Sequence, residues 1–159
     1  MVSEATVATL AGVSVTASFP FYLYGAWIVI DSETVTWSVL LRHLKFIVVG
    51  LVLTTVPVVG WMIPRLMDQF GGLAVLHAVL GLQAYAMLAF ALTGIARIFQ
   101  AKHAANLYRD PDQDVDLNDL HENMSAWRGR LRIGVFGYVL FWIGAYLIGV
   151  VRYVQLHLL

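Results

Sequence analysis

From Ile133 to Val151 the chain reads IGVFGYVLFWIGAYLIGVV, without one aspartate, glutamate, lysine or arginine. A helix over this stretch would be roughly 28 Å long at about 1.5 Å per residue, close to the roughly 30 Å of a bilayer core. Three more charge-free stretches precede it, at Ala5–Ile30, Phe46–Pro64 and Gln69–Ala96. Because lipid cannot satisfy free backbone donors and acceptors, spans of this length are predicted to be helices.

The composition of the whole chain agrees with a membrane protein. Of its 159 residues, 60% are hydrophobic and 13% charged, against about 45–50% and about 25% in soluble domains. The predicted fold class is therefore all-α, an integral membrane four-helix transmembrane bundle. We expect a single transmembrane domain over residues 1–159, with spans at about 7–30, 46–64, 70–98 and 130–152. The first span contains Pro20, where we expect a kink.

Charge and motif content exclude several functions. Ten basic and ten acidic residues cancel, so no overall basic field points to nucleic acid. The chain has no cysteine, which excludes disulfides, thiolate metal sites and covalently attached haem. No carboxylate lies in mid-span, which argues against a proton-coupled transporter. Without a catalytic triad, a phosphate loop or a zinc motif, the protein is expected to act beside larger partners rather than as an independent enzyme.

The basic residues predict the orientation. The third connection carries six of them and the first carries two, whereas the second has only Arg65. The positive-inside rule puts the first and third connections in the cytoplasm, and so both termini outside the cell membrane. The third connection, about 103–127, has an acidic centre without the glycine and glutamate of a calcium loop, and we expect a solvated turn there. A helix is predicted to begin near Asn118 or Asp119 and to continue through Trp127 into the last span.

Small residues mark the faces on which these helices would pack. Ala74, Ala78 and Gly81 share a face of the third span, and Gly137 and Gly144 share one on the fourth. Small side chains let membrane helices approach closely. The sequence predicts packing within one bundle on these faces, and the alternative is an interface between two copies of the chain.

The histidines are the candidates for chemistry. His77 lies within an otherwise apolar helix, where an imidazole needs a partner; it is either a ligand or redox group, or a structural hydrogen-bonding residue. His43, His103 and His121 lie on the predicted cytoplasmic side. The 26 residues from His77 to His103 correspond to roughly 39 Å of helix, so these two cannot share an iron. A bis-histidine haem site is thus restricted to the cytoplasmic side, and His77 would need a partner such as methionine.

Three segments carry a resemblance to known families. Arg42-His43 opening a helix that closes with Val56-Pro57-Val58-Val59-Gly60 resembles the first core helix of small diheme b-type cytochromes. Leu76-His77 through Gln83, with Leu92-Thr93-Gly94-Ile95 after it, is similar to their next helix, and His121 followed by Gly129–Gly134 is similar to a later one. The pattern also resembles a small four-helix family of prokaryotic membrane proteins associated with maturation of haem–copper terminal oxidases.

This resemblance, over about residues 40 to 150, implies haem b as the cofactor and a respiratory complex or terminal oxidase as the partner, besides the lipid bilayer. It implies cofactor-binding positions at His43, His77, His121 and His103. A diheme cytochrome would need four histidines in two depth-matched pairs, and no second ligand is obvious on the outer side. The function expected is a respiratory-membrane protein that handles haem or electrons. The alternative is a non-catalytic scaffold or accessory subunit of a larger membrane complex.

Overall fold

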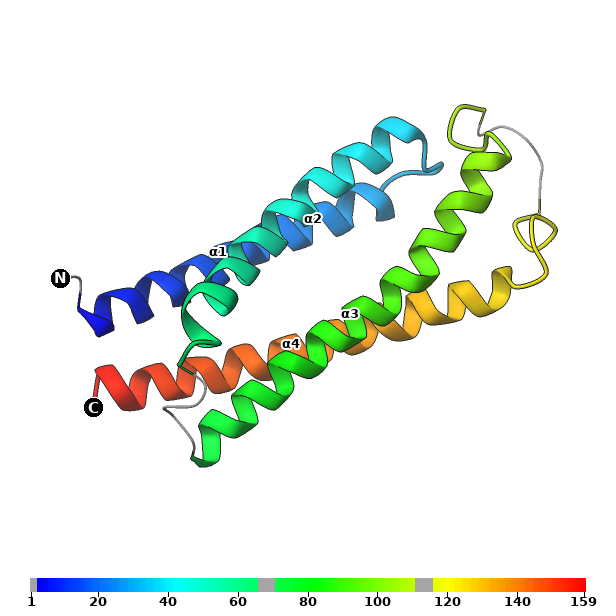
Figure 1. Cartoon of the computed structure of the whole chain (residues 1–159). Helices are drawn as coiled ribbons and strands as arrows, with labels where there is room; N and C mark the ends of the chain where they lie inside the picture. Colours follow the sequence, from blue (N-terminus) through cyan, green and yellow to red (C-terminus); the bar gives the residue numbers. More distant parts are fainter. Residues whose placement is uncertain (1–2, 66–70, 111–115) are drawn as a thin grey trace. The chain divides into compact units, whose positions relative to one another are not determined.

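The computed structural model describes residues 3–65, 71–110 and 116–159 (Figure 1). Its elements are α1 (Glu4–Ile30), α2 (Trp37–Pro57), the π-helical turn η1 (Val58–Met62), α3 (Gly72–Ala104) and α4 (Met124–His157). Within these residues there is no strand, and four helices are long and apolar enough to cross a membrane. The all-α, four-helix transmembrane class predicted from the sequence is therefore confirmed. The acidic centre of the third connection lies largely outside the described residues.

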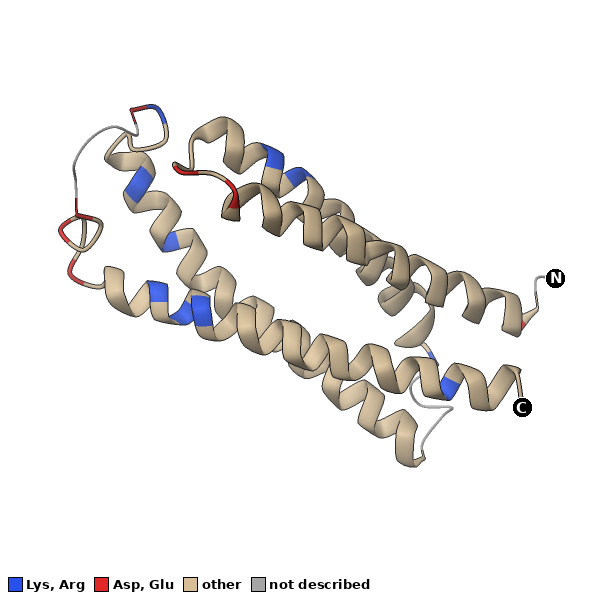
Figure 2. Cartoon of the chain, turned by 180° about the vertical axis from the view of Figure 1, so that it is seen from behind, with Lys and Arg blue, Asp and Glu red and all other residues tan. Residues whose placement is uncertain are grey.

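The helices differ at their ends from the spans expected. α2 begins at Trp37, where the Thr36 hydroxyl accepts a hydrogen bond from the Val39 amide, and so takes Arg42 and Lys45 into its first turns. α3 continues to Ala104, and α4 runs from Met124 through Trp127 to His157. A charge-free stretch ends at the first cation, but a helix continues through the interface because long basic side chains reach water from there. In Figure 2 the charged residues lie toward the ends of the helices, and the middle part of each helix carries none.

The chain forms two compact units. The first comprises residues 1–74 and 149–159, and the second residues 75–148. In the first, α1 packs along α2, and the Tyr153 hydroxyl near the end of α4 lies 2.7 Å from that of Thr9 on α1. Arg65, just after η1, lies over the ring of Trp61, and its Nε atom is 3.7 Å from the Glu4 carboxylate. This ion pair joins the segment after α2 and η1 to the start of α1.

Two glycines and a set of hydroxyls bring α1 and α2 together. A Cβ on Gly25 would lie 2.9 Å from Ile47 Cδ1, and one on Gly50 would lie 2.9 Å from Tyr22 Cε1. The Tyr22 and Thr54 hydroxyls are 2.9 Å apart, one turn of α2 beyond Gly50. Because apolar burial gives little net driving force in lipid, close approach and interhelical hydrogen bonds are what hold such a pair together.

Pro57 explains one of these hydrogen bonds. A proline has no amide hydrogen, so the carbonyl four residues earlier, that of Leu53, loses its helical donor. The Ser14 hydroxyl on α1 donates to this Leu53 carbonyl at 2.8 Å. The α-helix then passes directly into the π-helical turn η1. The other proline inside a helix, Pro20, does not interrupt α1, which stays helical from Glu4 to Ile30.

In the second unit, α3 and α4 approach until their backbones touch. A Cβ on Gly134 would lie 2.6 Å from the Ala91 nitrogen, and one on Gly94 would lie 2.5 Å from the Trp127 carbonyl oxygen. Gly137 faces Met87 and Gly144 faces Leu80, so the expected use of Gly137 and Gly144 is confirmed. Gly81, in contrast, has no such neighbour within 4 Å in the described residues. On α3 the closest contacts, at Ala91 and Gly94, are therefore about three turns or more beyond Gly81.

A left-handed residue ends α3. Asn106 has a φ of 56°, its amide donates to the His103 carbonyl, and the Leu107 amide donates to the Lys102 carbonyl. This is the Schellman pattern, in which glycine is the usual residue and asparagine the next. The turn places Tyr108 against Phe99, and burial there raises the pKa of the Tyr108 phenol.

Asn106→Gly is expected to leave stability unchanged or slightly higher, because glycine adopts this conformation without steric cost. Asn106→Val should lower the free energy of unfolding by about 1–2 kcal/mol, since a β-branched side chain is strained at positive φ. Thermal unfolding of the purified protein, followed by circular dichroism, checks both. Equal melting temperatures for the two variants would contradict a left-handed residue at position 106.

Candidate functional site

His43 lies in the second turn of α2, and its ring is fixed by a contact to α1. The His43 Nδ1 atom is 2.8 Å from the Gly25 carbonyl oxygen, and the side chain is half-buried. A carbonyl can only accept, so Nδ1 carries the proton and donates. In the neutral ring the lone pair is then on Nε2. A backbone carbonyl holding Nδ1–H while Nε2 stays available is the arrangement by which proteins orient histidine ligands.

Gly25 makes this contact feasible. Without a side chain, it lets Phe46 and Ile47 of α2 close onto α1, which brings the carbonyl within reach of the imidazole. One turn beyond His43, the Phe46 ring lies 4.6 Å from that of Tyr24 in an edge arrangement and 6.2 Å from that of Phe21. These three rings give the α1–α2 pair an aromatic cluster beside His43, an apolar setting suited to a flat aromatic group.

His121 has a different role. Its Nδ1 atom accepts a hydrogen bond from the Asn123 amide at 3.0 Å, and its carbonyl accepts one from the Met124 amide. The ring lies against Trp127, with centroids 4.4 Å apart. In the neutral ring the proton is then on Nε2, so neither nitrogen has a free lone pair for a metal. His121 satisfies amides at the start of α4 in the way that short polar residues do at an N-cap.

The other two candidates lie at opposite ends of α3. His103 is exposed in the last turn and stacks on Phe99 at 5.8 Å. His77 is half-buried near the start of the helix and is not without a partner. They are 26 residues apart on one continuous helix, so they do not share a ligand, as the sequence predicts. His43 belongs to the first unit, and His77, His103 and His121 to the second.

No multidentate metal centre accompanies these histidines in residues 3–65, 71–110 and 116–159. No group of three or more His, Cys, Asp or Glu side chains there could hold a metal ion. Of the four candidate histidines, His43 could offer a haem iron one imidazole nitrogen, Nε2, because its Nδ1 donates to the Gly25 carbonyl. The four do not fit two bis-histidine haems, because His121 uses Nδ1 as a helix cap.

The partner of His43 has no sequence signal. Gly25 lies 18 residues before His43 in another helix, and no motif links the two. Outside this site, at the other end of α2, Trp61 is identifiable from the sequence only as an interfacial tryptophan. In the structure its indole Nε1 is buried without a hydrogen-bond partner among the described residues.

Comparison with known proteins places the chain in a family. Residues 4–158 match the family described as a domain of unknown function, DUF7321, and the chain belongs to it. No curated protein and no solved structure matches the chain.

Proposed function

We propose that this member of the DUF7321 family is an accessory protein of a respiratory membrane that holds haem through His43 and works beside a larger complex, such as a terminal oxidase. The observation that carries the proposal is the 2.8 Å contact between His43 Nδ1 and the Gly25 carbonyl. It fixes the ring and its tautomer, which a ligand requires and a merely interfacial histidine does not. Bound haem would supply one-electron chemistry or would be passed on to the partner.

The single-ligand arrangement favours the accessory role over a diheme cytochrome. Electron transfer across the membrane through two haems would need two pairs of imidazoles at matching depths. Of the four candidates, His121 is occupied as a helix cap, and His77 and His103 are at opposite ends of α3. A single oriented histidine would hold haem less tightly than a pair of histidines, which suits a protein that releases its haem.

A second candidate function is a scaffold without a cofactor. The same His43 contact favours it, because a hydrogen bond between α1 and α2 also stabilises the helix pair, as do those of Tyr22 and Ser14. In that case the histidines have structural roles alone, and the protein acts through its surfaces.

Haem titration distinguishes these functions. Purified protein in mild detergent, titrated with ferric haem, is expected to give a saturable Soret shift with one haem per chain. The accessory role also predicts that most of this haem transfers to an excess of apomyoglobin. Only a linear, non-saturating rise in absorbance would favour the scaffold.

The orientation inferred from the basic residues is part of the proposal, with both termini outside the cell membrane. Arg97 lies in the last turns of α3, and Arg128 and Arg130 lie in the first turns of α4. Figure 2 shows basic residues toward this end of both helices, and the positive-inside rule associates such a charge pattern with a cytoplasmic end. Because the chain has no cysteine, Asn118→Cys and Ser3→Cys each give a unique label site. In intact cells an impermeant maleimide should label Cys at position 3 and spare position 118; the reverse pattern would contradict this orientation.

A further inference from the structure

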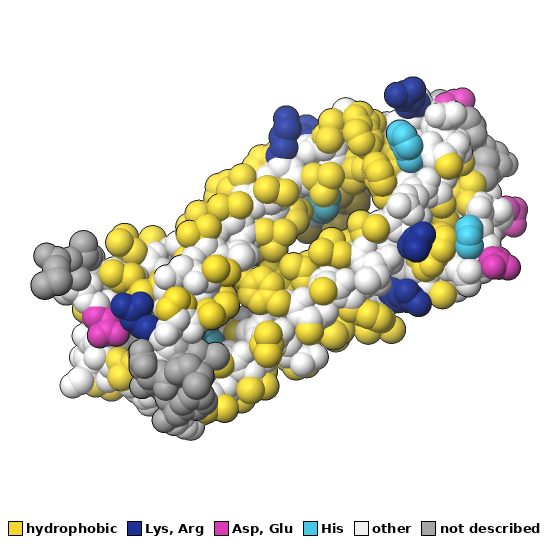
Figure 3. Space-filling model, in the orientation of Figure 1, with side chains coloured by type: hydrophobic (Ala, Val, Ile, Leu, Met, Phe, Trp, Pro, Cys, Tyr) yellow, Lys and Arg dark blue, Asp and Glu magenta, His cyan; other side chains and the backbone are white. Residues whose placement is uncertain are grey.

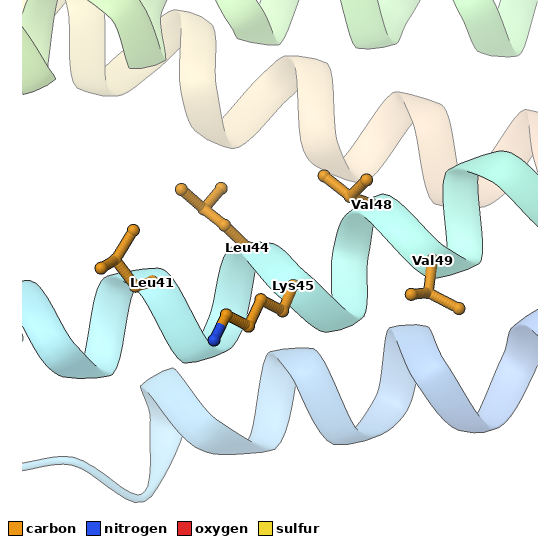
Figure 4. Close-up of a pocket in the computed structure, with 5 residues that line it drawn as sticks. All are labelled: Leu41, Leu44, Lys45, Val48 and Val49. Carbon is orange, nitrogen blue, oxygen red and sulfur yellow. The ribbon is translucent and has the colours of Figure 1, made fainter.

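A shallow groove runs along the face of α2 that points away from α1. Its cavity volume is about 360 Å³, and it is lined by Leu41, Leu44, Lys45, Val48 and Val49 (Figure 4). The spacing i, i+3, i+4, i+7, i+8 puts all five on one side of the helix. The contacts with α1 use the opposite side, through His43, Ile47 and Gly50. Four of the five lining side chains are aliphatic and exposed. Figure 3 shows that hydrophobic side chains cover much of the helix surface in that view.

Two cations border this groove at its cytoplasmic end. Arg42 and Lys45 lie one turn apart on the same edge of α2, and both are exposed. In Figure 4 the Lys45 side chain runs back toward Leu41, so its ammonium lies nearer the start of the helix than its Cα. This is the direction in which a lysine reaches from a membrane span to the headgroup layer.

Neither cation has an acidic partner in the part of the chain that the structure describes. The ion pair found there joins Arg65 to Glu4, and neither Arg42 nor Lys45 has a polar partner among residues 3–65, 71–110 and 116–159. Two such positive charges in the first turns of a membrane helix would be neutralised by a negative group at the same depth. The apolar groove that continues from them toward the bilayer centre has the surface that a hydrocarbon chain would contact.

We propose that this groove binds one anionic phospholipid of the cytoplasmic leaflet. Its phosphate lies between the Arg42 guanidinium and the Lys45 ammonium, and one acyl chain lies along Leu41, Leu44 and Val48. A zwitterionic lipid would fit the same apolar wall but would bring its own cation to Arg42 and Lys45. The site is therefore selective by headgroup charge, at about fivefold for each cation, the equivalent of about 1 kcal/mol.

A fluorophore in the groove tests this proposal. Val52→Cys places a unique label on the same face, one turn beyond Val48, where the native side chain is 53% exposed. The labelled protein is reconstituted in phosphatidylcholine with rising fractions of lipid brominated on its acyl chains, either phosphatidylglycerol or phosphatidylcholine. Val139→Cys on α4, in a stretch without cations, is the matched control. Val56→Cys, also exposed, replaces Val52→Cys if the latter does not fold.

We expect brominated phosphatidylglycerol to quench the label at position 52 at a several-fold lower fraction than brominated phosphatidylcholine. Both lipids should quench position 139 alike. Arg42→Gln and Lys45→Gln should each reduce the preference about fivefold, and the double variant should abolish it. Equal quenching of position 52 by the two lipids would overturn the proposal. So would the absence of quenching by either lipid, because protein, from this chain or a second copy, would then cover the groove.

Discussion

Gly134→Ala is expected to unfold or separate the α3–α4 pair, with a loss of at least about 3 kcal/mol, at the upper end of the cost of overpacking. The added methyl carbon would lie 2.6–2.7 Å from the nitrogen and α-carbon of Ala91. These are backbone atoms, which cannot rotate away as a side chain can, so one helix must move. The Gly94→Ala change is expected to act in the same way against the Trp127 carbonyl.

The matched control is Gly81→Ala, on the same helix as Gly94 but with open space at the Cβ position. Helix propensity alone favours alanine over glycine by about 1 kcal/mol, so this variant should be as stable as the wild type or more so. Stability is measured by unfolding in mixed micelles with rising mole fractions of a denaturing detergent. If Gly134→Ala and Gly81→Ala unfold at the same fraction, the close contact between α3 and α4 does not exist.

His43→Ala is expected to weaken haem binding by about 100-fold or more. Losing a partner of a ligating histidine typically costs about 10–100-fold, and losing the ligand itself should cost at least as much. The fold should survive, because an interhelical hydrogen bond in a membrane is worth about 0.6–2 kcal/mol. His43→Asn separates the two roles: its amide nitrogen takes the place of Nδ1 and can still donate to the Gly25 carbonyl, which keeps the stability but not strong haem binding. Haem titrations and unfolding curves on the same preparations check both parts.

His121→Asn and His157→Ala are the controls for this experiment. An asparagine oxygen at position 121 can accept the Asn123 amide as the imidazole does, so this variant should keep both its stability and its haem affinity. His157, near the end of α4 with its ring beside Tyr153, should be without effect on haem. A loss of affinity in His121→Asn would mean that His121, and not only His43, contacts the haem.

The sequence predicts the fold class and the number of helices because a charged side chain is costly to bury in a bilayer. Each membrane span is therefore visible as a long stretch without charged residues. It does not predict the helix ends, since Arg42 and Lys45 lie inside α2 while charge-free counting starts after them. Of the small residues, Gly137 and Gly144 are on the α3–α4 contact, but Gly81 is not. Composition shows which residues permit a close approach, and only the rotation of the two helices about their axes decides which ones are used.

The site is less predictable than the fold. His43 stands out from its place at the start of a span, but the partner that fixes its ring is a backbone carbonyl, which has no sequence signature. His121 is a candidate ligand through the family resemblance, in a stretch where the helix is expected to start near Asn118. Once α4 begins at Met124, His121 is at a capping position, and its Nδ1 is the acceptor for a terminal amide. An error of a few residues in a helix boundary thus changes the chemistry assigned to a side chain.

In the proposed function, one imidazole, that of His43, holds the haem iron. Electron paramagnetic resonance of the ferric haem complex tests it most directly, because the number of strong axial ligands sets the spin state. A single histidine predicts a high-spin spectrum, one that disappears in His43→Ala and persists in His121→Asn. A low-spin spectrum typical of two axial imidazoles would contradict the claim, as would a high-spin spectrum that His43→Ala leaves unchanged.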